Sequence, residues 1–192
     1  MFSTLLAELR SDPAIWERCQ RLFAIQAFPA KTTLLREGEV ATHMYYVKTG
    51  CLRLWFNKNG KDVTFQFFFE DQPVSSLESF ILGEPSPFSL ETLEPTTVAT
   101  ITRRDWDEVY NLVPKLREQL MGFLLKRMGD YGRLFLSRIK DSPRERYEAL
   151  VREHPEILQR IPQHYIASYI GITPVSLSRI RARKSRKKPG AS

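Results

Sequence analysis

Residues 168–188 read SYIGITPVSLSRIRARKSRKK, and they decide how the C-terminal part of the chain is interpreted. Small and apolar residues fall on one face of a first short helix: Ile166, Ala167 and Ile170. Gly171 follows where the chain must turn through a left-handed backbone conformation. Thr173 is a good N-cap for a second helix, and Pro174 fits its first position. The stretch therefore predicts two short helices joined by a tight turn.

The second predicted helix has an inward and an outward face. Leu177 and Ile180, three residues apart, point back toward the first helix. The outward side chains are small or basic: Val175, Ser178, Arg179, Ala182 and Arg183, with Ser176 at the margin. In a helix-turn-helix unit the second helix enters the DNA major groove, and its N-terminal residues contact base edges. This outward face therefore favours DNA binding.

The excess of positive charge lies in the same segment. The chain has 29 Lys and Arg residues against 22 Asp and Glu residues. Seven of the basic residues lie between Arg179 and Lys188 with no carboxylate among them, so everything before Arg179 is formally neutral. We therefore expect the C-terminal segment to contact a polyanion, either a nucleic acid or an anionic membrane surface.

Other classes of protein are disfavoured by what the sequence lacks. No apolar run approaches the roughly 18 residues of a membrane span, and the start MFSTLLAELRSD has no secretion-signal cleavage site, so we expect a cytoplasmic protein. Cys19 and Cys51 have no metal-binding spacing, and the histidines follow no HxH or HExxH pattern, which predicts neither a metal site nor a cofactor. No catalytic constellation stands out, so we expect no enzyme.

The first two thirds of the chain has the pattern of short β-strands. The runs MYYV, CLRLWF and DVTFQFFF are rich in β-branched and aromatic residues, and FSLETLEPTTVATITRRDW supplies at least one more pair. Asn59-Gly60 is a strong hairpin signal, so CLRLWF and DVTFQFFF should pair antiparallel. Repeated strands at this spacing predict a barrel or jelly roll. Because Phe67, Phe68 and Phe69 cannot all face one side of a strand, part of this aromatic cluster must be covered by another element or line a pocket.

A change of period predicts a helix of about 25 residues from Pro114 to about Lys140. One line of residues recurs at alternating spacings of four and three: Arg117, Met121, Leu124, Met128, Tyr131 and Phe135, with Leu116, Leu120, Phe123 and Leu134 beside it. This apolar band is wider than one supporting face requires. We expect the helix to bury one side on its own barrel and to offer another to a partner; a purely intramolecular helix is the alternative.

Ser142-Pro143 starts a smaller helical unit. Ser142 suits an N-cap, Pro143 fits the first turn, and Glu145 is placed to complete a capping box. We expect a helix, a break near His154-Pro155 and then two short helices. The predicted domains are a sensor barrel over 1–113, the long helix and hinge over 114–141, and the helix-turn-helix unit with its basic tail over 142–192.

This order of parts resembles the catabolite activator protein/fumarate–nitrate reductase regulator (Crp/Fnr) family of bacterial transcription factors. The resemblance rests on LREGE at 35–39, YYVKTGCLR at 45–53 and the segment IASYIGITPVSLSRIR, and it covers nearly the whole chain. It implies an α+β fold with an N-terminal cyclic-nucleotide-binding-type β jelly roll, a long dimerisation helix and a C-terminal helix-turn-helix domain. It also implies a homodimer on double-stranded DNA with a two-fold symmetric site, and RNA polymerase is a candidate partner.

The sequence departs from the family pattern at the effector site. Cyclic-AMP-binding members carry a Gly-Glu pair and an Arg-Ser pair around the nucleotide, and the matching places here hold Ser75-Ser76 and Ser86-Pro87. A buried phosphate needs a cation or free N–H donors, yet PVSSLESFILGEPSPF has neither Arg nor Lys, and Pro87 lacks an N–H. We therefore expect a barrel that does not bind cyclic AMP as those members do. The candidate effector pocket is Ser75, Ser76, Ser86 and Pro87.

The chain also departs at its C-terminal end, where it leaves little room for the β-wing found in many members. The stretch KSRKKPGAS is expected to be a disordered arm that adds nonspecific, salt-dependent affinity. Carried over from the family, the base-reading positions fall on Pro174, Val175 and Arg179. The first two would read thymine methyl groups or groove shape, whereas Arg179 would fork onto guanine O6 and N7. The predicted DNA-binding set is completed by Thr173, Ser176, Ser178 and Arg183.

The sequence thus predicts a dimeric, sequence-specific transcription regulator with an unknown small-molecule effector or none. The alternative is a barrel-type sensor whose basic C-terminus binds RNA or an anionic surface nonspecifically. An enzyme is the third alternative, with no constellation of residues to support it.

Overall fold

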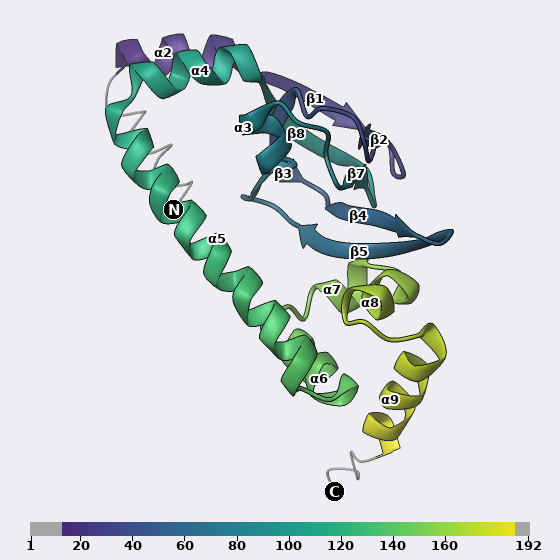
Figure 1. Cartoon of the computed structure of the whole chain (residues 1–192). Coiled ribbons are helices and arrows are strands. Elements are labelled where there is room, and N and C mark those ends of the chain that lie inside the picture. The colour runs from purple at the N-terminus through teal and green to yellow at the C-terminus, as the bar shows by residue number, and fades with distance from the viewer. Residues whose placement is uncertain (1–12, 187–192) are drawn as a thin grey trace, which may run out of the picture. The chain divides into compact units, whose positions relative to one another are not determined.

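The computed structural model describes residues 13–186 (Figure 1). Its strands are β1 Ala24–Phe28, β2 Thr33–Leu35, β3 His43–Thr49, β4 Leu52–Lys58, β5 Lys61–Phe68, β6 Pro73–Val74, β7 Ser89–Thr92 and β8 Thr96–Thr102. They form two four-stranded sheets, in the orders β1-β8-β3-β6 and β2-β7-β4-β5. The neighbours β1 and β8, β3 and β8, and β4 and β7 pair antiparallel. The predicted β-rich domain is therefore a β-sandwich.

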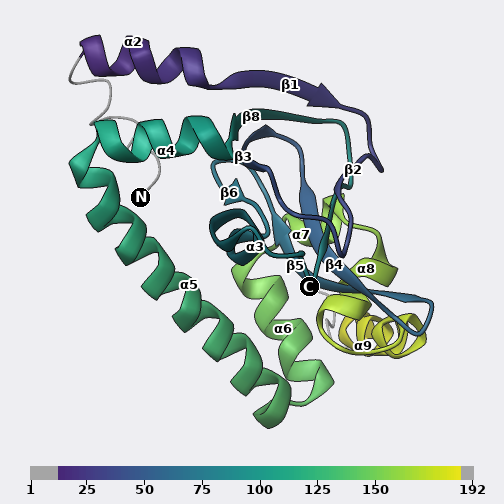
Figure 2. The same cartoon turned by 45° about the horizontal axis from the view of Figure 1, so that its top comes forward.

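The helices are α2 Pro13–Leu22, α3 Leu77–Leu82, α4 Arg103–Leu112, α5 Pro114–Lys140, α6 Pro143–Glu153, α7 Ile157–Arg160, α8 Gln163–Tyr169 and α9 Pro174–Arg186. α2 lies alongside α4, as Figures 1 and 2 show from two directions, and Arg18 pairs there with Glu108 at 2.8 Å. The long helix α5 has the start and the end that the sequence predicts. Among the described residues, no helix has the length and apolar character needed to span a membrane.

The β4–β5 hairpin forms as predicted. Asn59 (φ 53°) and Gly60 (φ 78°) both have left-handed backbones, as a two-residue type I′ turn requires. The Gly60 N–H donates to Oδ1 of Asn57 at 2.9 Å, which closes the turn. Local turn chemistry is therefore enough to bring these two strands into register.

Apolar side chains fill the space between the two sheets. The largest fully buried members of this core are Phe68, Phe80, Leu52, Leu90, Val47, Val74 and Val98. Phe67, Phe68 and Phe69 are all buried, but of the three only Phe68 belongs to this core, as the alternation of side chains along a strand requires. The guanidinium of Arg127, from α5, lies 4.8 Å from the centre of the Phe68 ring.

The chain divides into two compact units. The first contains the residues up to Phe56 together with Phe65–Arg127, and the second contains Asn57–Thr64 and the chain from Met128 onward. The domain boundaries expected at 113 and 141 remain predictions. α5 contributes residues to both units, so it is a single element that links them in the chain.

In the second unit, the start of α6 has the predicted capping box. Ser142 Oγ accepts the Glu145 N–H at 3.3 Å, and the Glu145 carboxylate accepts the Ser142 N–H at 2.7 Å. The hydrogen bonds that the Ser142 hydroxyl and the Ser142 N–H donate to the Glu145 carboxylate hold the pKa of that carboxyl below its usual value. After the predicted break at His154, the one-turn helix α7 precedes α8 and α9, so there is one more helix than expected. Residues 143–186 contain no strand.

Candidate nucleic-acid interface

Gly171 forms the turn between α8 and α9, as the sequence predicts. Its φ of 73° is left-handed, and a Cβ at this position would meet Nη1 of Arg138 at 3.2 Å. The N–H groups of Gly171 and Ile172 donate to the carbonyls of Ser168 and Ala167, at 3.1 and 2.9 Å. These bonds close the end of α8 and send the chain into α9.

α8 and α9 pack through small and apolar residues. Buried residues at this contact are Ile166, Ala167, Ile170 and Leu177. Leu177 is 1 % exposed, whereas Ile180, predicted to face inward as well, is half-buried. The inward face of α9 is therefore anchored mainly at Leu177.

Thr173 caps α9. Its Oγ1 accepts the N–H of Ser176 at 3.2 Å, and the two hydroxyl oxygens lie 3.0 Å apart. The cap satisfies one of the N–H groups that have no partner inside a helix. The Thr173 and Ser176 hydroxyls thus have a local role in starting the helix.

The outward face of α9 has the predicted composition. The exposed residues at its start and along this face are Thr173, Pro174, Val175, Ser178, Arg179, Ala182 and Arg183. Val175 is 60 % exposed, so its apolar side chain lies at the surface at the start of the helix. Ser176 is half-buried, in keeping with its place at the margin. α9 continues to Arg186, so residues 184–186, expected to begin a disordered arm, are helical because the helical pattern is not interrupted there. The rest of the basic tail lies outside the described residues.

α5 carries a second exposed surface. Its exposed apolar side chains are Met121, Leu125, Met128, Phe135, Leu136 and Ile139. Leu125, and not the predicted Leu124, continues the line from Met121 to Met128. Gly132, and not the predicted Tyr131, which is half-buried, lies between Met128 and Phe135 on this line, and the side chain of the predicted Arg117 lies outside the description. On the other side, Leu116 is buried in the core of the first unit. We call the line Met121, Leu125, Met128, Gly132, Phe135 and Ile139 the exposed seam.

The candidate effector residues do not offer a set of free hydrogen-bond donors, because two of their hydroxyls already donate to backbone carbonyls. The Ser75 hydroxyl donates to the carbonyl of His43 at 2.9 Å, and the Ser86 hydroxyl donates to the carbonyl of Phe88 at 2.7 Å. Both serines are buried, as is Ser76 at the start of α3, whereas Pro87 is exposed. The Ser75 hydroxyl thus ties its segment to β3, and the Ser86 hydroxyl closes a turn within its own loop.

Two residues of this region were missed from the sequence. Ser79 is buried, and its Oγ donates to the carbonyl of Glu84 at 2.5 Å and accepts the N–H of Ala41 at 2.9 Å. Arg103, from α4, donates to the carbonyl of Ile81 at 2.8 Å. The segment PVSSLESFILGEPSPF has no Arg or Lys, but the fold brings Arg103 of α4 to the end of α3. No local sequence pattern predicts this contact.

Comparisons with known proteins agree with this architecture. Residues 25–112 match the family model of the cyclic nucleotide-binding domain. The transcriptional activator protein FnrA of Stutzerimonas stutzeri is 26 % identical over 162 residues, which cover 79 % of this chain and 66 % of that protein. The chain thus spans slightly less than two thirds of the length of this relative.

Solved structures share the fold over most of the chain. FixK2 of Bradyrhizobium japonicum has a TM-score of 0.75 at 15 % identity and covers 88 % of each chain. The c-di-GMP responsive global regulator CLP of Xanthomonas campestris has a TM-score of 0.69 at 18 % identity, covering 94 % of this chain and 96 % of the other. Residues 25–112 thus match a cyclic nucleotide-binding domain, and the shared fold agrees with the resemblance to the Crp/Fnr family that the sequence predicts.

Proposed function

We propose that this protein is a sequence-specific DNA-binding transcription regulator that acts as a homodimer through a C-terminal helix-turn-helix domain. The observation that carries the proposal is the outward face of α9, where Val175, Ser178 and Arg179 are exposed while Leu177 anchors the opposite side. A helix whose inward face is packed against the rest of its domain, and whose outward face carries small and basic side chains, fits the major groove. The FnrA relative, a transcriptional activator by name, supports the same function.

Within α9, Arg179 is the proposed base-reading residue. Its guanidinium has the planar fork that matches O6 and N7 of guanine, whereas Pro174 and Val175 offer only apolar contact to thymine methyl groups or the groove wall. Thr173, Ser176, Ser178 and Arg183 are the proposed phosphate contacts. The half-site is therefore expected to contain a guanine whose identity depends on Arg179.

The test is selection from a randomised duplex pool at near-physiological salt, without and with cyclic AMP. We expect a two-fold symmetric site to be enriched without the nucleotide. Arg179→Ala should then lose about 1–3 kcal/mol of discrimination at one guanine position. Arg152→Ala, an exposed arginine of α6, is the control and should leave the preference unchanged. Retained preference in Arg179→Ala would refute the base contact.

The salt dependence of DNA affinity distinguishes the contribution of the basic tail from that of α9. Removal of residues 184–192 deletes Lys184, Arg186, Lys187 and Lys188. In the dimer, whose two tails together lose eight of these cations, it should weaken binding to all sequences alike and reduce the slope of log K against log salt by about 7. Binding with no enriched sequence in the intact protein would instead assign the function to the tail and favour RNA or an anionic surface.

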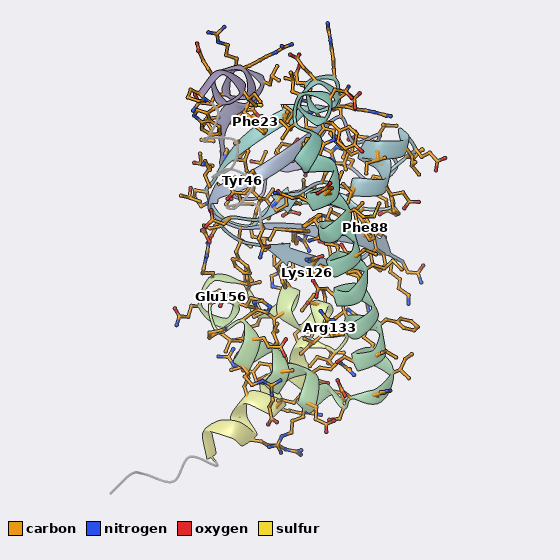
Figure 3. The ribbon with its side chains drawn as sticks, turned by 90° about the vertical axis from the view of Figure 1, so that its left-hand side faces the viewer. Phe23, Tyr46, Phe88, Lys126, Arg133 and Glu156 are labelled. Atoms are coloured by element: carbon orange, nitrogen blue, oxygen red, sulfur yellow. The ribbon has the colours of Figure 1, made fainter. Side chains whose placement is uncertain are left out.

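The homodimer is proposed on the exposed seam of α5. Apolar side chains spaced alternately by four and three residues are the pattern with which two helices pack in a coiled coil, and Met128 is 73 % exposed in the single chain. Met128→Glu and Phe135→Glu should therefore give monomers in sedimentation equilibrium. Lys126→Glu, an exposed position of the same helix labelled in Figure 3, should leave the dimer intact. A monomeric parent protein would contradict the proposal.

The sensor barrel is proposed not to bind cyclic AMP through the contacts typical of the family. The hydroxyls of Ser75 and Ser86 are used for backbone carbonyls, and the nearby cation Arg103 is engaged with Ile81. Titration calorimetry with cyclic AMP should give no saturable heat. Saturable binding that is lost in Ser86→Ala would overturn this part of the proposal.

A further inference from the structure

The C-terminal end of α8 is held by two arginines that come from other helices of the second unit. Nη2 of Arg138, in the last turn of α5, donates to the carbonyl of Tyr169 at 2.5 Å. Nε of Arg146, in α6, donates to the carbonyl of Ile170 at 2.9 Å. The accepting carbonyls lie in the segment that turns the chain into α9.

These carbonyls belong to the part of a helix that has no intrahelical partners. The N–H groups of the turn donate to earlier carbonyls, those of Ile166, Ala167 and Ser168. The last carbonyls of a helix need donors from elsewhere, and a cation also complements the negative end of the helix dipole. The two arginines supply both.

Arg146 connects two places at once. Besides the carbonyl of Ile170, its guanidinium donates through Nη1 to the carbonyl of Asp141, at 2.5 Å. Asp141 directly follows α5, so one planar group bridges the end of α5 and the end of α8. A lysine carries its charge on a single nitrogen and lacks the rigid fork that places donors on two fixed acceptors.

Each end of this bridge is itself held in place. The Asp141 carboxylate lies 2.5 Å from the Ser137 hydroxyl, and the capping box of Ser142 fixes the first turn of α6. Partial burial lowers the pKa of the Arg138 guanidinium, Tyr169 opposes that shift, and the charge of Arg146 adds to it, so the two arginines influence each other electrostatically. Their mutual repulsion is tolerated because both guanidinium groups face backbone carbonyls.

We propose that Arg146, with Arg138 beside it, is a positioning residue that fixes the direction of α9 relative to the last turns of α5, and thereby sets the half-site spacing that the dimer accepts. The inference rests on the proposed function, since spacing has meaning only for a dimer on DNA. Recognition helices of a two-fold dimer must enter major grooves about 34–36 Å apart. A loosened turn would leave base contacts intact but spread the angles at which α9 is presented.

The experiment uses the full chain and duplexes that carry the selected half-sites at the preferred spacing and at spacings one and two base pairs longer or shorter. We expect the parent protein to show one sharp optimum. Arg146→Lys should bind the optimal duplex at least about 10-fold more weakly, because hydrogen bonds from a charged donor are lost. Its preference among spacings should flatten, while its preferred bases stay the same.

Arg144→Lys is the matched control. Arg144 lies on the same helix but is exposed and pairs only locally with Glu148 at 2.8 Å, so its spacing profile should equal that of the parent. Arg138→Lys removes a single contact and serves as the second variant if Arg146→Lys does not fold. Arg133→Lys, from an exposed pair with Asp130 on α5, is its control (Figure 3).

The outcomes are distinguishable. Affinity that falls equally at every spacing, with an unchanged profile, would mean that Arg146 only stabilises the fold, and it would overturn the inference while leaving the proposed function standing. A parent protein that selects no symmetric site would remove the proposed function and the inference with it. A flattened profile in both Arg146→Lys and Arg138→Lys, but in neither control, supports the positioning role.

Discussion

Gly50 joins β3 to β4, and replacing it tests how tightly the first unit is packed. Its φ of +99° is left-handed, and an added Cβ would lie 2.5 Å from Oγ1 of Thr96 and 2.7 Å from the carbonyl oxygen of Pro95. Gly38 is the matched comparison, because its φ is +90° but nothing lies within 4 Å of the added Cβ. Gly50→Ala and Gly38→Ala therefore introduce the same kind of backbone strain, but only Gly50→Ala also makes a steric clash.

The magnitudes follow from these two contributions. A left-handed backbone costs an alanine about 1–2 kcal/mol, so Gly38→Ala should lose about that much free energy of unfolding. Gly50→Ala adds an overpacking cost of about 1–3 kcal/mol, because the atoms that it meets include the backbone of Pro95 and Thr96, which cannot rotate away. We therefore expect a loss of about 2–5 kcal/mol for Gly50→Ala.

Equilibrium urea unfolding followed by tryptophan fluorescence is the assay. Trp16, Trp55 and Trp106 are the three tryptophans of the chain, and all lie in the first unit, so their signal reports the unit that contains Gly50. The urea concentration at the midpoint of unfolding should fall, while the m-value, the slope of the unfolding free energy against urea concentration, stays constant. Equal losses for Gly50→Ala and Gly38→Ala would refute the argument, because the close approach of Thr96 would then have no energetic consequence.

Three further predictions concern other parts of the molecule. Burial raises the pKa of Tyr45 from 10 to about 12, so its contribution to stability is full below about pH 10 and is lost as the pH rises toward 12; Tyr45→Phe should remove that part of the pH dependence of urea unfolding above pH 10. Ser142→Ala should cost about 1 kcal/mol as a lost N-cap, seen as faster amide exchange in the first turn of α6, whereas Ser142→Asp should restore protection. Leu177→Ala should destabilise the α8–α9 contact by about 2–5 kcal/mol, measured as faster exchange of the Ile172 amide, with the tryptophan-detected transition of the first unit unchanged.

Features that depend on neighbours in the chain were predicted well. Asn59-Gly60, the Ser142 capping box, Gly171 and Thr173 each act through hydrogen bonds or backbone angles within a few residues. The sequence therefore contains all the information needed to place these turns and caps. The same holds for the 27-residue length of α5, which follows from an uninterrupted helical period after Pro114.

Features that depend on which helix face meets which surface were predicted less well. The apolar band of α5 is wide, and both Leu124 and Leu125 fit a helical stripe, so only packing decides that Leu125 is exposed and Leu124 half-buried. The candidate effector pocket stays a prediction, and the bond that uses the Ser75 hydroxyl depends on where the fold places His43, 32 residues away in the chain.

The sequence by itself determined the order of the β-rich part, the long helix and the helix-turn-helix unit, together with the turns, the caps and the small, basic outward face of α9, because each is set by the residues of one continuous segment. Only the tertiary structure brought Arg138 and Arg146 to the carbonyls at the end of α8, and Arg103 to the end of α3. A long arginine side chain reaches acceptors on any element that packs nearby, so its partner is fixed by the fold and not by its neighbours in sequence.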